Sequence, residues 1–169
     1  APVYYVLGNH EVATNYVGDI YASLEALGVH TLKNEAVTFE RGDDTMTIAG
    51  IEDPLMNTPT KDMLDEALQY VRDDEFTLLL AHRPEMIEHY ANAAVDVVFS
   101  GHAHGGQIRI PFVGGLVAPG QGLFPKYTSG RYDELNTSMY LSRGLGNSSM
   151  PFRVLNLPEI LVVELKKTK

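Results

Sequence analysis

The most constraining feature of the sequence is a set of short apolar segments that each end in polar residues. Three of these segments are VYYVL (residues 3–7), FTLLL (76–80) and VDVVF (95–99). Their length and their β-branched and aromatic content are typical of buried strands. The polar residues that follow them are Gly8-Asn9-His10-Glu11, Ala81-His82 and Ser100-Gly101-His102-Ala103-His104. Because ligands bind outside the carboxyl ends of strands in open α/β sheets, we expect these side chains to form one site.

Helical segments alternate with the predicted strands. Apolar side chains recur at helical spacing in residues 15–27 and 60–72, with Gly28 as a C-terminal stop and Thr60 as an N-cap. Pro84 fits the first turn of a third helix. Residues 36–40 and 45–49 flank Arg41-Gly42-Asp43-Asp44 and predict a hairpin. This alternation predicts an α/β fold with helices over the faces of a sheet.

The second half of the chain predicts fewer regular elements. A short strand is expected at residues 107–110, a long loop at the Gly- and Pro-rich residues 111–136, and closing strands at 139–142 and 160–165. No internal repeat or linker divides the sequence. We therefore expect residues 1–169 to belong to a single domain.

Composition narrows the classes of function. The chain has no cysteine, which excludes disulfides, thiolate metal sites and cysteine nucleophiles. No apolar run approaches 18 residues, so no transmembrane segment or signal peptide is predicted, and the compartment stays open between cytoplasm and bacterial cell envelope. The net charge is −9, with 15 acidic and 4 basic side chains in residues 1–75. Nucleic acid is therefore not expected as a partner.

The histidine pair His102-Ala103-His104 has a spacing that suits two metal ions. Side chains at i and i+2 of a turn diverge, so they serve two neighbouring ions better than one. Neutral imidazole binds zinc, iron and manganese, and Asn9 can add an oxygen ligand. Two ions about 3.5–4 Å apart polarise a phosphate and stabilise the attacking and leaving oxygens.

These motifs, in this order and strand context, resemble the calcineurin-like metallophosphoesterase superfamily. The segments that resemble its bacterial YkuE/YaeI-type phosphodiesterase subgroup are His82-Arg83-Pro84-Glu85, Gly105-Gly106-Gln107, GQGLFPKY (120–127) and SRGLGN (142–147). The resemblance covers essentially the whole chain. It implies a four-layer sandwich of two mixed β-sheets flanked by helices, and hydrolysis of a phosphodiester by a metal-bound hydroxide.

The resemblance also implies a role for several residues. One metal ion would be held by Asn9, His82 and His102, and a second by His104. The ions of the full-length enzyme would be two divalent cations, namely manganese, zinc or iron.

Two further residues match the catalytic positions of the superfamily. His10 would contact the phosphate and assist the leaving group, and Glu11 would orient His10. A carboxylate beside a histidine raises the pKa of the imidazole and fixes its tautomer. The alternative role of Glu11 is that of a negative charge at a helix N-terminus.

The sequence also departs from the superfamily. Its Asp-x-His and Gly-Asp motifs precede Gly-Asn-His, whereas here only seven residues precede Gly8 and no Asp-x-His occurs. Asp53 is the best of the other acidic residues as a replacement, ahead of Glu11, Glu52 and Glu85, but none is favoured. We therefore expect the chain to be the C-terminal portion of the domain, without its N-terminal βα portion. Since a bridging carboxylate is missing, we expect at most one weakly bound metal ion and impaired activity.

The same departure has consequences for folding. Without the missing strands, residues 3–7 would keep an unpaired edge and an uncovered apolar face. We expect a second copy of the chain to cover them, in a strand-exchanged homodimer.

The substrate is expected to be a phosphodiester, including a lipid-linked one. Arg143 and Asn147 are the first candidates to bind it, because arginine recognises phosphate by two parallel hydrogen bonds. Weaker candidates are Lys126, Arg131 and Arg153. Four apolar residues, interpreted as core beneath the loop or as a wall for an apolar substituent, are Phe112, Leu116, Phe124 and Phe152.

Two other interpretations remain open at the level of the sequence. The chain could be a non-catalytic metal-binding or interaction module that keeps the fold. It could also be one half of an enzyme that assembles from two polypeptides. An Asp-x-His strand encoded directly upstream would favour the phosphodiesterase over both.

Overall fold

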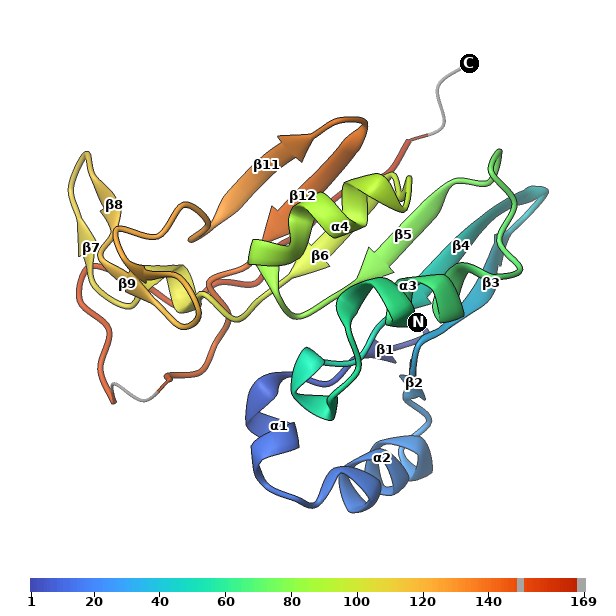
Figure 1. The fold of residues 1–169 in the computed structure, drawn as a ribbon, viewed down its shortest axis with the longest axis horizontal. Coiled ribbons are helices and arrows are strands. Elements are labelled where there is room, and N and C mark those ends of the chain that lie inside the picture. Colours follow the sequence, from blue (N-terminus) through green and yellow to red (C-terminus); the bar gives the residue numbers. More distant parts are fainter. Residues whose placement is uncertain (149–150, 167–169) are drawn as a thin grey trace.

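A computed structural model describes residues 1–148 and 151–166 and shows a mixed α/β fold built on a six-stranded sheet (Figure 1). The strands, in their order across the sheet, are β11 (Gly130–Glu134), β12 (Thr137–Leu141), β6 (Val97–Ser100), β5 (Thr77–Leu80), β4 (Asp44–Gly50) and β3 (Glu35–Arg41). The inner four strands are parallel to one another, and β3 and β11 close the edges as antiparallel hairpin partners. The predicted α/β class is confirmed.

Two helices pack on one face of this sheet. Helix α3 (Thr60–Leu68) contacts β3 and β4, and α4 (Ile87–Asn92) contacts β11 and β12. Short 3-10 turns precede them at Pro54–Met56 (η1) and Pro84–Met86 (η2). The predicted N-cap Thr60 is wrong by one residue, because the extended backbone of Pro59 forms the cap and Thr60 is the first helical residue.

The two faces of the sheet differ because strand side chains alternate. Leu79, Val98 and Met139 point to the helical face and are fully buried against α3 and α4. Leu78 and Val97 point to the opposite face. We call this the open face, because many of its apolar side chains are only partly buried, namely Val37, Phe39, Met46, Leu80, Phe99 and Tyr140.

The N-terminal region forms a small sheet of its own. Strand β1 (Tyr4–Tyr5) pairs in parallel with β2 (His30–Thr31), and α1 (Asn9–Ala13) and α2 (Val17–Ala26) connect them. The predicted strand 3–7 is therefore two residues long. This sheet lies close to β4, since a Cβ on Gly50 would lie 2.4 Å from the Cβ of Leu32.

Two predictions for the second half of the chain are wrong. The expected loop 111–136 contains β11 and the short strands β8 (Gly114–Gly115), β9 (Val117–Ala118) and β10 (Gly122–Leu123), of which β9 pairs with β10. The strand expected at 107–110 is present as β7 (Arg109–Ile110), which pairs with β8. Close backbone approach between glycines permits this packing, as a Cβ on Gly106 would lie 2.4 Å from Gly115 Cα. The expected strand 160–165 is absent because these residues have no ladder partner in the part of the chain that the structure describes.

Within the described residues, no helix has both the length and the apolar character needed to cross a membrane. Helix α2, at 10 residues, is the longest of those described.

Candidate active site

Polar side chains gather where the parallel strands end. Asp53 follows β4, His82 follows β5, His102 follows β6 and Arg143 follows β12. These four strands run in the same direction, so their carboxyl ends share one edge of the sheet. Helix α1 begins at Asn9 and brings that side chain to the same edge. The fold therefore places these residues at the carboxyl ends of the parallel strands, where the site is expected.

Three donor atoms form a close triangle at this edge. Asn9 Oδ1 lies 2.9 Å from His82 Nε2 and 2.9 Å from His102 Nδ1. The two imidazole nitrogens are 3.1 Å apart. Two ligands at about 2.1 Å from one ion are about 3.0 Å apart in octahedral geometry and about 3.4 Å apart in tetrahedral geometry. We call these three residues the inner triad, and their spacing fits the ligands of one metal ion.

Both imidazoles of the inner triad are neutral at physiological pH. Burial lowers the pKa of His82 to about 4 and that of His102 to about 3. Neutral imidazole has a free lone pair, which a metal ion requires. Without an ion, Asn9 Oδ1 can accept a hydrogen bond from each ring. Among the described residues, no group of three or more His, Cys, Asp and Glu could hold a metal ion, so the amide oxygen is an essential part of this donor set.

A strained turn separates the two histidines that follow β6. His102 and His104 have φ angles of +67° and +47°, in the left-handed region that non-glycine residues rarely adopt. His102 turns into the inner triad. The His104 ring lies 6.2 Å from the ring of His10, and its Nδ1 contacts Gly146 O at 3.2 Å. The turn therefore directs the two side chains to different neighbours.

Glu11 fixes the start of helix α1. Its carboxylate accepts a hydrogen bond from the backbone N–H of Gly8 at 3.0 Å. Gly8 itself lies against the site, since a Cβ there would be 2.8 Å from His82 Cε1. Through this hydrogen bond Glu11 acts as an acidic residue at a helix N-terminus, which is the alternative role expected from the sequence. Its orientation of the exposed His10 stays a prediction.

A buried ion pair that the sequence did not identify lies beside the inner triad. Asp53 is completely buried, and its two carboxylate oxygens accept hydrogen bonds from Arg83 Nε and Nη2 at 2.7 and 2.9 Å. Burial alone would raise the pKa of Asp53, but the bonds from Arg83 and from Leu55 N–H hold it below its usual value. Both carboxylate oxygens of Asp53 are therefore bonded to Arg83. The sequence signal for Asp53 is its position after a predicted strand, which does not identify Arg83 as its partner.

The predicted substrate-binding residues are held by contacts within the chain. Arg143 Nη2 donates to Glu159 Oε1 at 2.8 Å, and Asn147 Nδ2 donates to Pro151 O at 3.0 Å. Arg153 donates to the backbone carbonyl of Arg143. We call His10, His104, Arg143 and Asn147 the outer group.

The weaker candidates lie in other settings. Lys126 Nζ is 4.8 Å from the centre of the Tyr127 ring, and Arg131 pairs with Asp133 on the exposed β11–β12 hairpin. Neither contact places a cation beside the inner triad.

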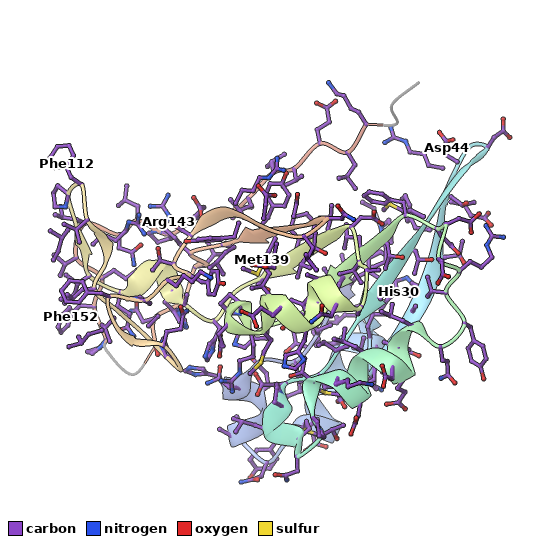
Figure 2. The ribbon with its side chains drawn as sticks, turned by 45° about the horizontal axis from the view of Figure 1, so that its top comes forward. His30, Asp44, Phe112, Met139, Arg143 and Phe152 are labelled. Carbon is purple, nitrogen blue, oxygen red and sulfur yellow. The ribbon has the colours of Figure 1, made fainter. Side chains whose placement is uncertain are left out.

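The interpretation of the four apolar residues as core is wrong for the three phenylalanines. Phe112, Phe124 and Phe152 are exposed, whereas Leu116 is partly buried. Phe112 and Phe152 project at the end of the molecule that carries the short ladders (Figure 2). The two-residue ladders there enclose no interior that would cover aromatic rings.

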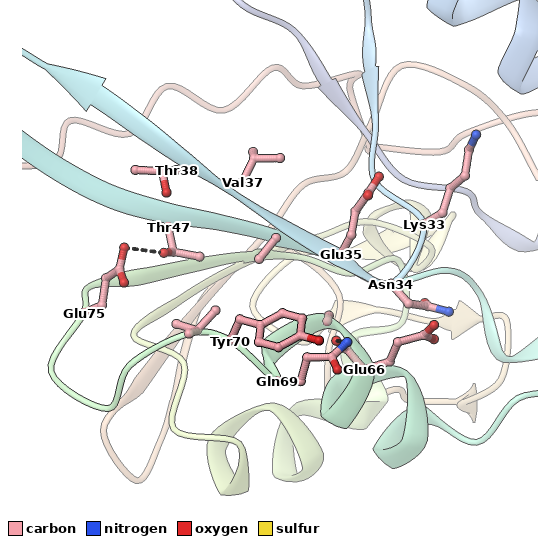
Figure 3. Close-up of a pocket in the computed structure, with 13 residues that line it drawn as sticks. Lys33, Asn34, Glu35, Val37, Thr38, Thr47, Glu66, Gln69, Tyr70 and Glu75 are labelled. Atoms are coloured by element: carbon pink, nitrogen blue, oxygen red, sulfur yellow. Dashed lines mark hydrogen bonds between the residues drawn. The ribbon is translucent and has the colours of Figure 1, made fainter.

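A separate pocket lies between β3 and α3 (Figure 3). Its volume is about 430 Å³, and its lining includes Lys33, Glu35, Glu66, Tyr70 and Glu75. Thr47 Oγ1 and Glu75 Oε1 bond across one side of it at 2.6 Å. None of its lining residues belongs to the inner triad or the outer group.

Comparison with known proteins adds the family. The chain is 34% identical to the uncharacterized metallophosphoesterase YkuE of Bacillus subtilis, over 96% of this chain and 56% of that protein. It is 35% identical to an uncharacterized metallophosphoesterase of Aquifex aeolicus (95% and 59%) and 29% identical to the phosphodiesterase YaeI of Escherichia coli (98% and 58%). No protein-family model matches the chain, and no solved structure matches it significantly.

These similarities confirm the resemblance that the motifs indicated: the chain is related to the calcineurin-like metallophosphoesterases. At the level of the family, this relationship supports metal-dependent hydrolysis of phosphoesters and divalent metal cofactors. The chain spans 56–59% of the length of the relatives named above.

Proposed function

We propose that this chain forms the C-terminal portion of a metal-dependent phosphodiesterase, and that the inner triad holds one divalent ion. The observation that carries the proposal is the triangle of Asn9 Oδ1, His82 Nε2 and His102 Nδ1, whose edges are 2.9, 2.9 and 3.1 Å. These three residues come from segments far apart in the sequence, yet they converge on one point. Relatives named metallophosphoesterase and phosphodiesterase match almost the whole chain.

The outer group would act on the substrate beside this ion. His10 is exposed next to His104, so its ring N–H can reach a phosphate oxygen or the leaving group. His104 Nδ1 contacts Gly146 O, which leaves Nε2 as the nitrogen for a second ion. When bound, divalent ions lower the pKa of a water molecule and stabilise charge on the phosphoryl oxygens.

Arg143 and Asn147 are proposed to bind the diester. Arg143 is already fixed by Glu159, so a phosphate would share its guanidinium with that carboxylate. Phe112 and Phe152 are exposed at the end of the molecule that carries the short ladders (Figure 2), and Phe124 is exposed as well. Exposed aromatic side chains of this kind suit the apolar substituent of a lipid-linked diester.

The donor set explains why we expect weak binding by the chain alone. Asn and neutral His bring no negative charge, and Asp53 is engaged with Arg83. Two divalent ions held by neutral ligands would repel each other with little compensation. We propose that the remaining carboxylate ligands, and the second sheet of a four-layer sandwich, come from a segment upstream of these residues in a longer domain.

Metal titration tests the proposal directly. Zn²⁺ and Mn²⁺ should each bind the 169-residue chain at no more than one site of the inner triad, and His82→Ala should remove that binding. A protein extended upstream by an Asp-x-His segment should hydrolyse an aryl phosphodiester with Mn²⁺, and His104→Ala should abolish that activity. Two tightly bound ions per isolated chain, or an extended protein that is inactive with every divalent metal, would contradict the proposal.

A second candidate function is a non-catalytic metal-binding or interaction module. The observation that favours it is the neutral donor set, which is more typical of a ligand cluster than of a two-metal catalytic centre. Activity of the extended protein excludes this candidate. A third arrangement, in which two polypeptides share the site, requires that a separate partner chain restores activity.

The open face supports the proposal that a second copy pairs with the chain. Leu80, Phe99 and Tyr140 on this face are partly exposed, and in the described residues β1 has β2 as its one ladder partner. Strand exchange would cover both features. Light scattering at micromolar concentration should give the mass of a dimer, and a monodisperse monomer would contradict this arrangement.

A further inference from the structure

Two charged side chains compete for the outer nitrogen of His102. Its Nδ1 belongs to the inner triad, and its Nε2 faces away from it. Arg83 Nη1 lies 3.4 Å from this Nε2, and Glu85 Oε1 lies 3.9 Å from it. One neighbour can donate a hydrogen bond and the other can only accept one. The tautomer of His102 therefore decides which of them it bonds.

The two tautomers differ in their ability to bind a metal. If Nδ1 carries the proton, it donates to Asn9 Oδ1, and Nε2 accepts from Arg83. In that state Nδ1 has no lone pair for an ion. If Nε2 carries the proton, the Nδ1 lone pair points into the inner triad and the Nε2–H needs an acceptor. A histidine that binds a metal through one nitrogen generally donates its other N–H to a carboxylate, a carbonyl or water.

Glu85 has the properties of that acceptor. Its Oε2 is buried and has no hydrogen-bond partner among the described residues. Its Oε1 is 3.5 Å from Arg83 Nη1, so the carboxylate is already held at the site. A buried carboxylate with an unpartnered oxygen is short of hydrogen-bond donors, and His102 Nε2–H would add one at Oε1, the oxygen that faces it.

The surrounding fold keeps this carboxylate in place. Arg83 is anchored by two bonds to the buried Asp53, so it cannot swing away from Glu85 without breaking them. On the other side, Gly120 leaves no space, since a Cβ there would lie 2.9 Å from Glu85 Oε1 and 3.6 Å from His102 Nε2. Glu85 is thus confined between Arg83, Gly120 and the ring of His102.

We propose that Glu85 is a positioning residue that stabilises the Nε2–H tautomer of His102 and thereby makes Nδ1 available to a metal ion. This inference rests on the proposed metal site. On metal binding the proton of the neutral ring moves from Nδ1 to Nε2, by exchange with water, and the hydrogen bond of Nε2 passes from Arg83 to Glu85. Arg83 keeps its bonds to Asp53 and holds the carboxylate beside the ring.

The test uses Zn²⁺ alone with five forms of the 169-residue chain: the unchanged chain, Glu85→Gln, Glu85→Asp, Glu88→Gln and His82→Ala. Glutamine keeps the shape of the side chain but removes the charge, and its amide can donate to Nε2 and so favour the wrong tautomer. Loss of such an outer partner typically weakens metal affinity by about 10–100-fold. Glu88 is an exposed carboxylate in the first turn of α4 and serves as the matched control.

Affinity is measured by competition with a chromophoric chelator, and the His102 tautomer by long-range ¹H–¹⁵N correlation with and without Zn²⁺. We expect the Zn²⁺-bound chain to carry the proton on Nε2, Glu85→Gln to bind about 10–100-fold more weakly, and Glu88→Gln to bind as the unchanged chain does. Partial recovery of affinity in Glu85→Asp would show that the charge matters and not packing alone.

Each other outcome is decisive. If Glu85→Gln binds Zn²⁺ as tightly as the unchanged chain, or if the bound form keeps the proton on Nδ1, the role of Glu85 is overturned while the metal site stands. If His82→Ala binds as tightly as the unchanged chain, or if none of the proteins binds Zn²⁺, the metal site itself is overturned and the role of Glu85 falls with it.

Discussion

The inner triad and the outer group lie at the same edge of the sheet but are held in different ways. The donor atoms of Asn9, His82 and His102 are within 3.1 Å of one another, and the two imidazoles are buried enough to stay neutral. His10 is exposed, and Arg143 is bonded to a carboxylate of the C-terminal segment. The proposed metal ligands are thus positioned by the ends of β5 and β6 and by α1, whereas Arg143 and Asn147, which we propose to bind substrate, lie in the segment that follows β12.

The largest expected difference between the two groups concerns metal affinity. His82→Ala removes a donor of the inner triad and should weaken Zn²⁺ binding by more than the roughly 100-fold that an outer partner can contribute. His104→Ala should leave binding of the first ion nearly unchanged, because its ring faces His10 and Gly146. Isothermal titration of both variants checks this, and equal losses would mean that the two histidines share one ion.

A second expected difference concerns packing tolerance. Gly8→Ala places a methyl group 2.8 Å from His82 Cε1 and 3.0 Å from Glu11 Oε2, so it should lower the free energy of unfolding by about 1–3 kcal/mol. The matched control is Gly18→Ala in α2, where a Cβ meets nothing within 4 Å. This substitution should raise the free energy of unfolding by about 0.5–1 kcal/mol. Urea unfolding measures the free energy of unfolding of both variants. If Gly8→Ala stabilised the chain as Gly18→Ala does, Gly8 would not be confined.

A third prediction uses the depressed histidine pKa values. His82 and His102 titrate near pH 6.5 when unfolded but at about 4 and about 3 in the folded chain. Between the folded and unfolded pKa values the unfolded chain therefore binds more protons than the folded chain. The contribution of the neutral imidazoles to the free energy of unfolding is fully present above pH 6.5 and should be lost as the pH falls toward 4.

Unfolding measured from pH 7.5 to 4.5 checks this pH dependence. His82→Gln should flatten it, whereas His89→Gln should leave it as it is, because His89 is exposed on α4. A pH dependence that survives unchanged in His82→Gln would show that this imidazole is not the source.

The smallest expected effect belongs to the outer group. Arg143 and Glu159 are both partly exposed, so Arg143→Ala should cost less than about 1 kcal/mol of stability. In a protein that hydrolyses a diester, the same change should raise KM more than it lowers kcat. A stability loss of several kcal/mol would show instead that Arg143 is a structural residue and not a binding one.

Much of the fold could be predicted because its signals are local. The strands ending at Leu80 and Ser100 come from short, continuous apolar runs, and α3 has its apolar side chains at helical spacing. Residues 160–165 have the same composition but form no strand, because a strand requires a partner backbone that composition does not reveal. The strands β8, β9 and β10 are not predicted from the sequence, because strands of two residues, half of them glycine, are too short to show an alternating apolar pattern.

The convergence of the candidate site was predictable for a related reason. Parallel strands bring their carboxyl ends together, so His82 and His102 had to approach each other once their strands were identified. The pairing of Asp53 with Arg83 was not predictable, because nothing in the sequence states which strand end faces which. The sequence offers Glu85 only as one of several acidic residues, and its position beside the outer nitrogen of His102 follows from η2 and from the loop at Gly120.

The inner triad also has a consequence for the connectivity of the molecule. It joins positions that are 73, 93 and 20 residues apart along the chain. An ion bound there would close these long loops at a single point, as a cross-link does, and would tie the N-terminal two-stranded sheet to the six-stranded one. Since such an ion binds only the folded chain, the melting temperature should rise with the free metal concentration and fall when a chelator is added.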